Sequence, residues 1–367
     1  MNSELIRRDF PILETKVNGH QIVYFDNAAT TQRPLPVVNA VLDYVTHDNG
    51  NPHRGAHIFA ISASEAYDSS KEVVRKFINA RSAEEIIYTR NTTESLNLVS
   101  RSYGETHLKK GDHILITIAE HHSNLVTWQR VAQKTGAVLD YIYVDKKTGH
   151  FPEEELKKID DPRVKIFAFA EVSNVLGIDF DPKPLIQRAH AHGAVVVLDG
   201  AQSTPHKRVD VQDLDCDFFA FSGHKMCSMG GIGVLYGKKE LLEDMEPFMM
   251  GGDMIEDVHE QETTFAELPA KFEAGTQYVE GAVSLVAAIR YVEAIGYDEI
   301  RAQERKLVTR CLEGMKKLPF IHIIGPENPE EKEGLVAFEV EGVHPHDVAQ
   351  ILSAWSRWKP GDRKSVV

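Results

Sequence analysis

A lysine placed to act as a nucleophile follows an apolar run in the middle of the chain. Residues 221–226 read FSGHKM and lead into a glycine-rich turn, so Lys225 follows a predicted strand. In α/β folds, ligands bind at the carboxyl edge of the sheet. A lysine amine that is desolvated or flanked by a cation is nucleophilic near neutral pH and forms Schiff bases with pyridoxal phosphate. A surface lysine in a loop would give the same hexapeptide, and this segment alone leaves both interpretations open.

An aspartate ends a second apolar run. Residues 194–198 read AVVVL, and Asp199 follows them. A carboxylate at a strand end can pair with the protonated pyridine nitrogen of pyridoxal phosphate, which keeps the ring an electron sink. The alternative is an aspartate that caps the next helix. Asp199 lies 26 residues before Lys225, one strand–helix–strand step, and this spacing favours the first interpretation.

Two further strand-to-helix junctions carry polar side chains. One reads RNTTE and contains Thr92 and Thr93; hydroxyls and free amides at a helix N-terminus bind phosphate. Plain helix capping by either threonine explains the same residues and is compatible with phosphate binding. The other junction reads EHHSN, where His121 could stack on a cofactor ring and move protons. The neighbouring His122 raises a metal site as an alternative, but no third ligand is spaced nearby, so we predict no metal.

The charge and composition exclude several classes of protein. Among 367 residues, 41 are Lys or Arg and 55 are Asp or Glu, which gives a net charge of −14 and disfavours nucleic-acid binding. The first residues lack the apolar region of a secretory signal, and no apolar run approaches the ~18 residues that span a bilayer. The three cysteines lie far apart, so neither a disulfide framework nor a zinc site follows. We therefore expect a cytoplasmic, soluble protein without nucleic-acid or membrane partners.

The middle of the chain alternates short apolar runs with amphipathic stretches. This alternation predicts an α/β domain with a mostly parallel sheet covered by helices. The predicted strands are 85–89, 113–117, 139–144, 165–170, 194–198, 218–221 and 233–236. The predicted helices between them include 65–79, 93–102, 123–134 and 184–192.

The pattern changes after about residue 285. Two long helices (283–294 and 298–317), a strand (335–340) and a helix (345–353) predict a smaller α+β domain, and 325–334 is expected to be an exposed loop. We predict a large domain over residues 20–284 and a small domain formed by 1–19 and 285–367.

Taken together, ordered segments from about residue 8 to 347 resemble the fold-type-I, class-V enzymes that use pyridoxal 5′-phosphate. The most similar group is the SufS-type (group II) cysteine desulfurases, which share their fold with selenocysteine lyases. The matching segments include YFDNAATT (24–31), HRG (53–55), FINA (77–80), SNVLG (173–177), DCDFF (215–219), GGDMI (251–255) and FEAGT (272–276).

The resemblance implies a role for each matching residue. Lys225 would carry the cofactor and move protons on the substrate carbon. Asp199 would hold the pyridine nitrogen, Gln202 would lie near the ring hydroxyl, and His121 would stack on the ring. The phosphate would be bound by Thr92, Thr93, Ser222 and His224, with Thr276 supplied by a second subunit. The amino-acid site would be lined by Ala28, Ala29 and Asn174, with His53 and Arg54 near it.

The resemblance also implies an activity and partners. Such enzymes take sulfur from L-cysteine, leave L-alanine, work as homodimers and hand the sulfur to an acceptor protein of iron–sulfur cluster assembly. A selenocysteine lyase or other β-lyase is the nearest alternative. A non-catalytic remnant that binds pyridoxal phosphate is an alternative of another class.

The sequence departs from the family pattern in its last stretch. Beyond Leu352 the family continues with an arginine-bearing turn and a loop that carries the persulfide cysteine, whereas residues 353–367 here differ, which suggests a frameshift or truncation. We expect Cys216 to be buried, Cys311 to lie within a helix, and Cys227 to miss the substrate sulfur. Sulfur transfer through a persulfide on this chain is therefore expected to be impaired. A smaller departure is Glu171, where the family often has histidine.

Overall fold

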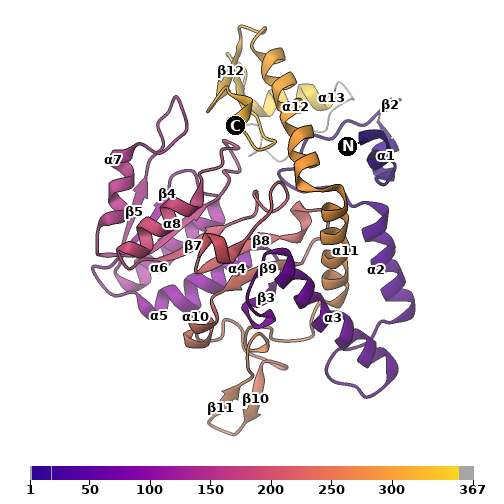
Figure 1. Ribbon diagram of the computed structural model, residues 1–367, viewed down its shortest axis with the longest axis vertical. Coiled ribbons are helices and arrows are strands. Elements are labelled where there is room, and N and C mark those ends of the chain that lie inside the picture. Colours follow the sequence, from indigo (N-terminus) through magenta and orange to yellow (C-terminus); the bar gives the residue numbers. More distant parts are fainter. Residues whose placement is uncertain (1, 18, 355–367) are drawn as a thin grey trace.

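A computed structural model describes residues 2–17 and 19–354, and its centre is a seven-stranded sheet (Figure 1). The strand order is β3-β9-β8-β7-β6-β4-β5. Only β9 runs antiparallel to its neighbours, so the sheet is mixed but mostly parallel. The strands are β3 (Ile86–Thr89), β4 (His113–Thr117), β5 (Val138–Ile142), β6 (Val164–Ala170), β7 (Val195–Asp199), β8 (Phe218–Ser222) and β9 (Gly233–Gly237). Each of the seven predicted strands is confirmed.

Helices cover both faces of this sheet, which explains why its strands are continuous apolar runs. One hydrophobic core includes residues of α3 (Ile58–Phe77), α8 (Pro182–Ala191) and α11 (Val279–Ile295). The other includes residues of α4 (Thr92–Val99), α6 (Val126–Thr135) and α10 (Lys239–Asp244). The shorter helices are α1 (Ser3–Arg7), α5 (Glu105–His107), α7 (Glu153–Leu156) and α9 (Val211–Leu214). No helix in the described ranges is long and apolar enough to cross a membrane.

Two of the longer helices differ clearly from the sequence prediction. Helix α3 begins at Ile58, well before the predicted start, because the His57 side chain accepts a hydrogen bond from the Ala60 amide (3.3 Å) and caps it. Helix α2 (Leu35–His47) was not predicted. It has no side-chain cap, and it packs against α11 while Leu42 and Val45 stay exposed.

The C-terminal layer comprises the described elements from residue 297 onward. It contains α12 (Tyr297–Met315), the antiparallel strands β12 (Ile321–Ile324) and β13 (Ala337–Val340), and α13 (Pro345–Ala354). Strand β12 was not predicted. The expectation of an exposed loop at 325–334 is wrong for Lys332, which is 2% exposed. The division into two domains stays a prediction, and residues 355–367 of the divergent end lie outside the described residues.

Two small hairpins lie outside the main sheet. Strands β1 (Lys16–Val17) and β2 (His20–Gln21) pair near the N-terminus. Strands β10 (Ile255–Val258) and β11 (Thr263–Phe265) form a hairpin that extends from the body at the bottom of Figure 1. Its strands are too short and too polar to have been recognised from alternation.

Candidate active site

Lys225 and Asp199 lie at the carboxyl ends of neighbouring parallel strands. Strand β8 runs directly into a 3₁₀ turn, Gly223–Lys225, and β7 ends at Asp199, which is in register with Ala220 of β8. Burial lowers the pKa of the Lys225 amine, and the nearby Asp199 carboxylate opposes that shift. Among the described residues, the Lys225 amine has no hydrogen-bond or ion-pair partner. The amine is therefore desolvated and uncommitted, as a nucleophilic lysine requires.

Asp199 is 4% exposed and does not cap a helix. Its Oδ1 accepts a hydrogen bond from the Ala201 amide (2.9 Å) in a turn, and no helix begins there, so the capping alternative is wrong. Burial raises the pKa of Asp199, and the charge of Lys225 acts in the opposite direction. A desolvated carboxylate of this kind gains from a cationic partner.

The N-terminus of α4 brings hydroxyl groups together beside β8. The Thr92 and Ser222 hydroxyls lie 2.7 Å apart, and the Thr92 amide donates to Ser222 Oγ (2.8 Å). The helix cap is Asn91, whose Oδ1 accepts from the Glu94 amide (3.0 Å), so the expectation that a threonine caps the helix is wrong. Neither threonine hydroxyl is used to cap the helix: the buried Thr92 hydroxyl contacts Ser222, and Thr93 is exposed.

His224 is held by the segment that carries Ala28 and Ala29. Its carbonyl oxygen accepts hydrogen bonds from the Thr31 amide (3.0 Å) and the Thr30 hydroxyl (3.1 Å). Burial lowers the pKa of His224 to about 4, with the charges of Lys225 and Arg33 acting in the same direction, so the ring is neutral at pH 7. A neutral imidazole can donate one hydrogen bond to a phosphate.

His121 begins the 3₁₀ turn His122–Asn124 after β4. The Ser123 amide donates to His121 Nδ1 (3.1 Å), which makes Nδ1 an acceptor and leaves Nε2 to carry the proton of the neutral ring. The preceding Glu120 anchors this turn, because its carboxyl group accepts from the Asn124 side chain (2.7 Å) and the Ala170 amide (3.1 Å). Sequence analysis overlooked Glu120, although its place beside His121 was a signal.

The residues predicted to line the amino-acid site include a turn that a long-range hydrogen bond holds in place. Gln202 Nε2 donates to the Ala28 carbonyl oxygen (2.9 Å), which ties the Ala28–Ala29 turn to the end of β7. Asn174 follows β6, and its Oδ1 is buried without a hydrogen-bond partner among the described residues. A buried amide oxygen without a partner is costly, and a bound ligand that donates to it would remove that cost.

Three predicted residues are not joined to this cluster by any hydrogen bond or ion pair in the described part of the chain. His53 Nε2 pairs with Asp68 (3.0 Å), and Arg54 pairs with Asp253 (2.6 Å). Thr276 is exposed, as expected of a residue offered to a second subunit. Their roles stay predictions.

Arg33 is a further residue that sequence analysis overlooked. Its guanidinium donates to the Thr31 carbonyl oxygen (2.5 Å), and in the described residues no carboxylate pairs with it. Arg33 lies two residues after the matched segment 24–31, and this proximity is the sequence signal from which it could have been found. Arg33 adds positive charge beside His224 and Cys227.

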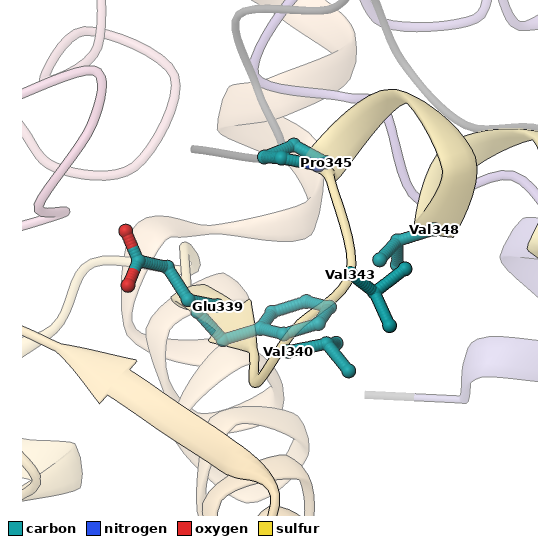
Figure 2. A pocket seen from close by; sticks show the side chains of 6 residues that line it. Glu339, Val340, Val343, Pro345 and Val348 are labelled. Carbon is teal, nitrogen blue, oxygen red and sulfur yellow. The ribbon is translucent and has the colours of Figure 1, made fainter.

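The described structure includes concave surfaces at two places of interest. An open cavity of about 580 Å³ lies between α4 and α6 and includes Thr93 and His121, so it adjoins the predicted site. The other lies in the C-terminal layer, where Figure 2 shows Glu339 beside apolar side chains including Val340 and Val348. It offers a single ionisable group and no catalytic constellation. No cluster of three metal-ligating side chains occurs among the described residues.

These observations fit pyridoxal phosphate. The amine without a hydrogen-bond partner suits the aldehyde carbon of the cofactor, and the buried carboxylate on the next strand suits its ring nitrogen. The hydroxyls at the helix N-terminus and the neutral histidine suit its phosphate. The orphaned Asn174 Oδ1 leaves a polar contact for the amino-acid partner.

Comparison with known proteins decides the family. Residues 23–355 match the aminotransferase class-V family. The chain belongs to this family, within the group of cysteine desulfurases. A probable cysteine desulfurase of Halalkalibacterium halodurans is 48% identical over 96% of this chain and 86% of its own length. One of Staphylococcus aureus is 46% identical, covering 93% and 82%.

Solved structures of cysteine desulfurases share the fold. That of Thermococcus onnurineus in its apo state has a TM-score of 0.90 and 41% identity, covering 97% of this chain and 86% of its own. That of CsdA from Escherichia coli, in an S-sulfonic acid form, has a TM-score of 0.89 and 36% identity, covering 100% and 89%. The protein is thus a fold-type-I enzyme of the cysteine desulfurase family, and its cofactor is pyridoxal 5′-phosphate.

The first prediction concerns which lysine carries the cofactor. Borohydride reduction of the desulfurase loaded with pyridoxal phosphate, followed by peptide mapping, should label Lys225, because its amine is desolvated and uncommitted. The Lys225→Ala variant should lose the label, whereas Lys207→Ala should keep it, because the Lys207 amine is paired with Glu171 and Asp179 (2.6 Å each). A label on another lysine of the unmodified protein would sink the assignment.

The second prediction concerns Glu120. Burial raises its pKa from 4.5 to about 8. Between these values the unfolded chain releases the proton while the folded protein keeps it, so the free energy of unfolding falls as the pH rises, by at most about 1.4 kcal/mol per pH unit. Urea unfolding at pH 5 and pH 8 should show a larger loss of stability for the unmodified protein than for Glu120→Gln. An equal loss would mean that Glu120 is ionised in the folded protein.

Proposed function

We propose that this enzyme removes sulfur from L-cysteine, leaves L-alanine, and supplies the sulfur to an acceptor protein of iron–sulfur cluster assembly. The observation that carries the proposal is the uncommitted Lys225 amine beside the buried Asp199 carboxylate. The relatives named probable cysteine desulfurase support the choice of substrate. The arrangement suits chemistry at an amino-acid α-carbon, because an amine with a lowered pKa both attacks carbonyl carbon and exchanges protons near neutral pH.

Bound pyridoxal phosphate supplies an electron sink for bonds at the substrate α-carbon. When the cofactor is bound, Asp199 would face the ring nitrogen, Gln202 would lie near the ring hydroxyl, and His121 would stack on the ring. The phosphate would be held by the hydroxyls of Thr92, Thr93 and Ser222 and by the neutral His224 ring. The Lys225 amine would take the proton from the substrate α-carbon and return one to the product.

The substrate occupies the other side of the site in this proposal. The Ala28–Ala29 turn, fixed by Gln202, forms one wall, and the Asn174 amide oxygen accepts a hydrogen bond from the amino acid. We propose that His53 and Arg54 lie near the amino-acid site. The Asp253 carboxylate holds the Arg54 guanidinium (2.6 Å), which limits the orientations that Arg54 can adopt.

Sulfur transfer needs a thiolate acceptor. The thiolate bonds to the substrate sulfur, the carbon–sulfur bond breaks with its electrons on carbon, and a proton on that carbon completes alanine; the acceptor becomes a persulfide. Burial raises the pKa of Cys227 to about 11, and it raises the pKa values of Cys216 and Cys311 as well. None of these three thiols is activated, so we propose that persulfide formation on the 367-residue chain is impaired.

The same observation favours a second candidate. A selenocysteine lyase or other β-lyase releases the heteroatom without attack by a protein thiolate, and the three thiols here are protonated at pH 7. L-Selenocysteine is therefore the alternative substrate. Three free cysteines suit a reducing compartment, and we place the enzyme in the cytoplasm.

The third prediction tests the reaction. The loaded 367-residue chain should form alanine from L-cysteine slowly, and Lys225→Ala should lower the rate by about 10²–10⁴-fold because it removes the proton-transfer group. Cys227→Ala should leave the rate within about twofold, because a thiol with a pKa of about 11 is almost wholly protonated at pH 7. Rapid turnover that disappears on Cys227→Ala would contradict the proposed impairment, and alanine formation unaffected by Lys225→Ala would contradict the proposed function.

The fourth prediction concerns the oligomeric state. We propose a homodimer in which the exposed Thr276 of each subunit contacts the phosphate site of the other. Glu273, three residues before Thr276, forms an ion pair with the buried Lys71 (2.5 Å). This ion pair holds the start of the segment that carries Thr276. Sedimentation of the loaded enzyme should give the mass of two chains. The mass of one chain at saturating cofactor would argue against the shared site.

A further inference from the structure

The loop that carries Asn174 is narrow and closed at its base. Val172 and Asp179 pair as an isolated antiparallel bridge, and the Phe180 amide donates to the Glu171 carbonyl oxygen (3.0 Å). The Lys207 amine spans the base, 2.6 Å from both the Glu171 and the Asp179 carboxylates. This explains the departure at Glu171: the carboxylate there belongs to an ion-pair network that closes the loop.

The tip of the same loop is a tight turn. Ser173 Oγ accepts from the amides of Val175 (3.3 Å) and Leu176 (3.2 Å), and the Gly177 amide donates to the Ser173 carbonyl oxygen (2.9 Å). Gly177 has φ +67°, which a residue with a side chain rarely adopts. The turn thus fixes the direction of Asn174.

The C-terminal layer holds this tip from outside. The Lys332 amine donates to the carbonyl oxygens of Leu176 (3.1 Å) and Ile324 (3.2 Å), and the Glu333 amide donates to the Gly177 carbonyl oxygen (2.7 Å). Lys332 is 2% exposed and has no carboxylate partner among the described residues. Its pKa is lowered to about 8 by burial, so it is still mostly charged at pH 7 and gives charge-assisted hydrogen bonds.

Close packing supports this attachment. A Cβ atom on Gly177 would lie 2.9 Å from the Leu335 carbonyl oxygen, and one on Gly325 would lie 3.5 Å from the Leu176 side chain. The tip of the loop therefore lies directly against residues 325–335. Burying an ammonium group costs more free energy than burying an apolar side chain of similar size. What Lys332 contributes at this position beyond an apolar side chain is therefore its hydrogen bonds to the loop.

We propose that Lys332 is a positioning residue that sets the affinity of the enzyme for its amino-acid substrate by fixing the Asn174 loop. The proposal rests on the proposed function, in which Asn174 contacts the amino acid. The loop carries the buried, unpartnered Asn174 Oδ1, and two carbonyl oxygens a few residues further along it accept hydrogen bonds from Lys332 and Glu333. Lys332 and Glu333 thereby act on the Asn174 loop from the C-terminal layer.

The fifth prediction compares two lysine variants of the loaded enzyme. Lys332→Met should bind L-alanine about tenfold more weakly in calorimetric titration, because the loop loses its charge-assisted hydrogen bonds. The matched control is Lys316→Met in the same layer, whose amine pairs with Glu327 (3.1 Å) on a half-exposed side chain; it should bind alanine as the unmodified enzyme does. Both variants should retain pyridoxal phosphate equally. Alanine affinity unchanged by Lys332→Met, or no alanine binding by the unmodified enzyme, would overturn the proposal.

A double-variant comparison shows whether Lys332 acts through Asn174. Asn174→Ala should weaken alanine binding, and Lys332→Met should weaken it little further in that background, because both changes remove the same contact. An additive loss would overturn the proposal. Lys332→Gln, which keeps a neutral donor, should give an intermediate affinity and replaces Lys332→Met if that variant does not fold. Failure of the proposed function would be seen separately, as no alanine formed from cysteine by the unmodified enzyme.

Discussion

The chemistry of this protein depends on two ionisable groups that are removed from water without being satisfied by each other. Burial lowers the pKa of Lys225 and raises that of Asp199, and the attraction between them reverses neither shift. Each group thus leans toward its neutral form, which is what a weakly compensated buried charge does. Such a pair of buried groups is costly by itself and gains from a ligand that brings a cationic ring nitrogen and a carbonyl carbon. The sheet, covered by helices on both faces, is stable enough to keep these two groups buried despite the free energy that their burial costs.

The register of the sheet determines which side chains share this edge. Asp199 is in register with Ala220, and Lys225 follows one short turn after β8 ends, while Thr92 begins the helix after β3. Because β9 runs antiparallel between β3 and β8, the carboxyl ends of those two strands still face the same edge. The Thr92–Ser222 contact joins the two strand ends directly (2.7 Å).

Much of the sheet and of the candidate site could be predicted, because both depend on patterns of neighbouring residues in the sequence. Continuous apolar runs marked all seven strands, and the polar residue after each run marked a place at the sheet edge. The contacts that complete the site are not local. Gln202 reaches Ala28, 174 residues away. Asn91 rather than a threonine caps α4, and the Thr92 amide donates to Ser222 of a distant strand. Helix α2 escaped prediction because it lacks a side-chain cap and keeps apolar residues on its outer face.

Burial affects several lysines in the described part of the chain, among them Lys71, Lys225 and Lys332, and the partners of these three explain why only one of them suits catalysis. Lys71 forms an ion pair with Glu273 (2.5 Å), so its amine is held as a charged structural group. The Lys332 amine donates hydrogen bonds to two carbonyl oxygens and is likewise engaged. Lys225 alone of the three has neither a carboxylate nor a carbonyl oxygen in hydrogen-bond contact among the described residues. Burial lowers the pKa of all three amines, but a lowered pKa yields a nucleophile only where the lone pair faces a ligand site. Geometry, and not the pKa shift, therefore distinguishes the candidate catalytic lysine from the two structural ones.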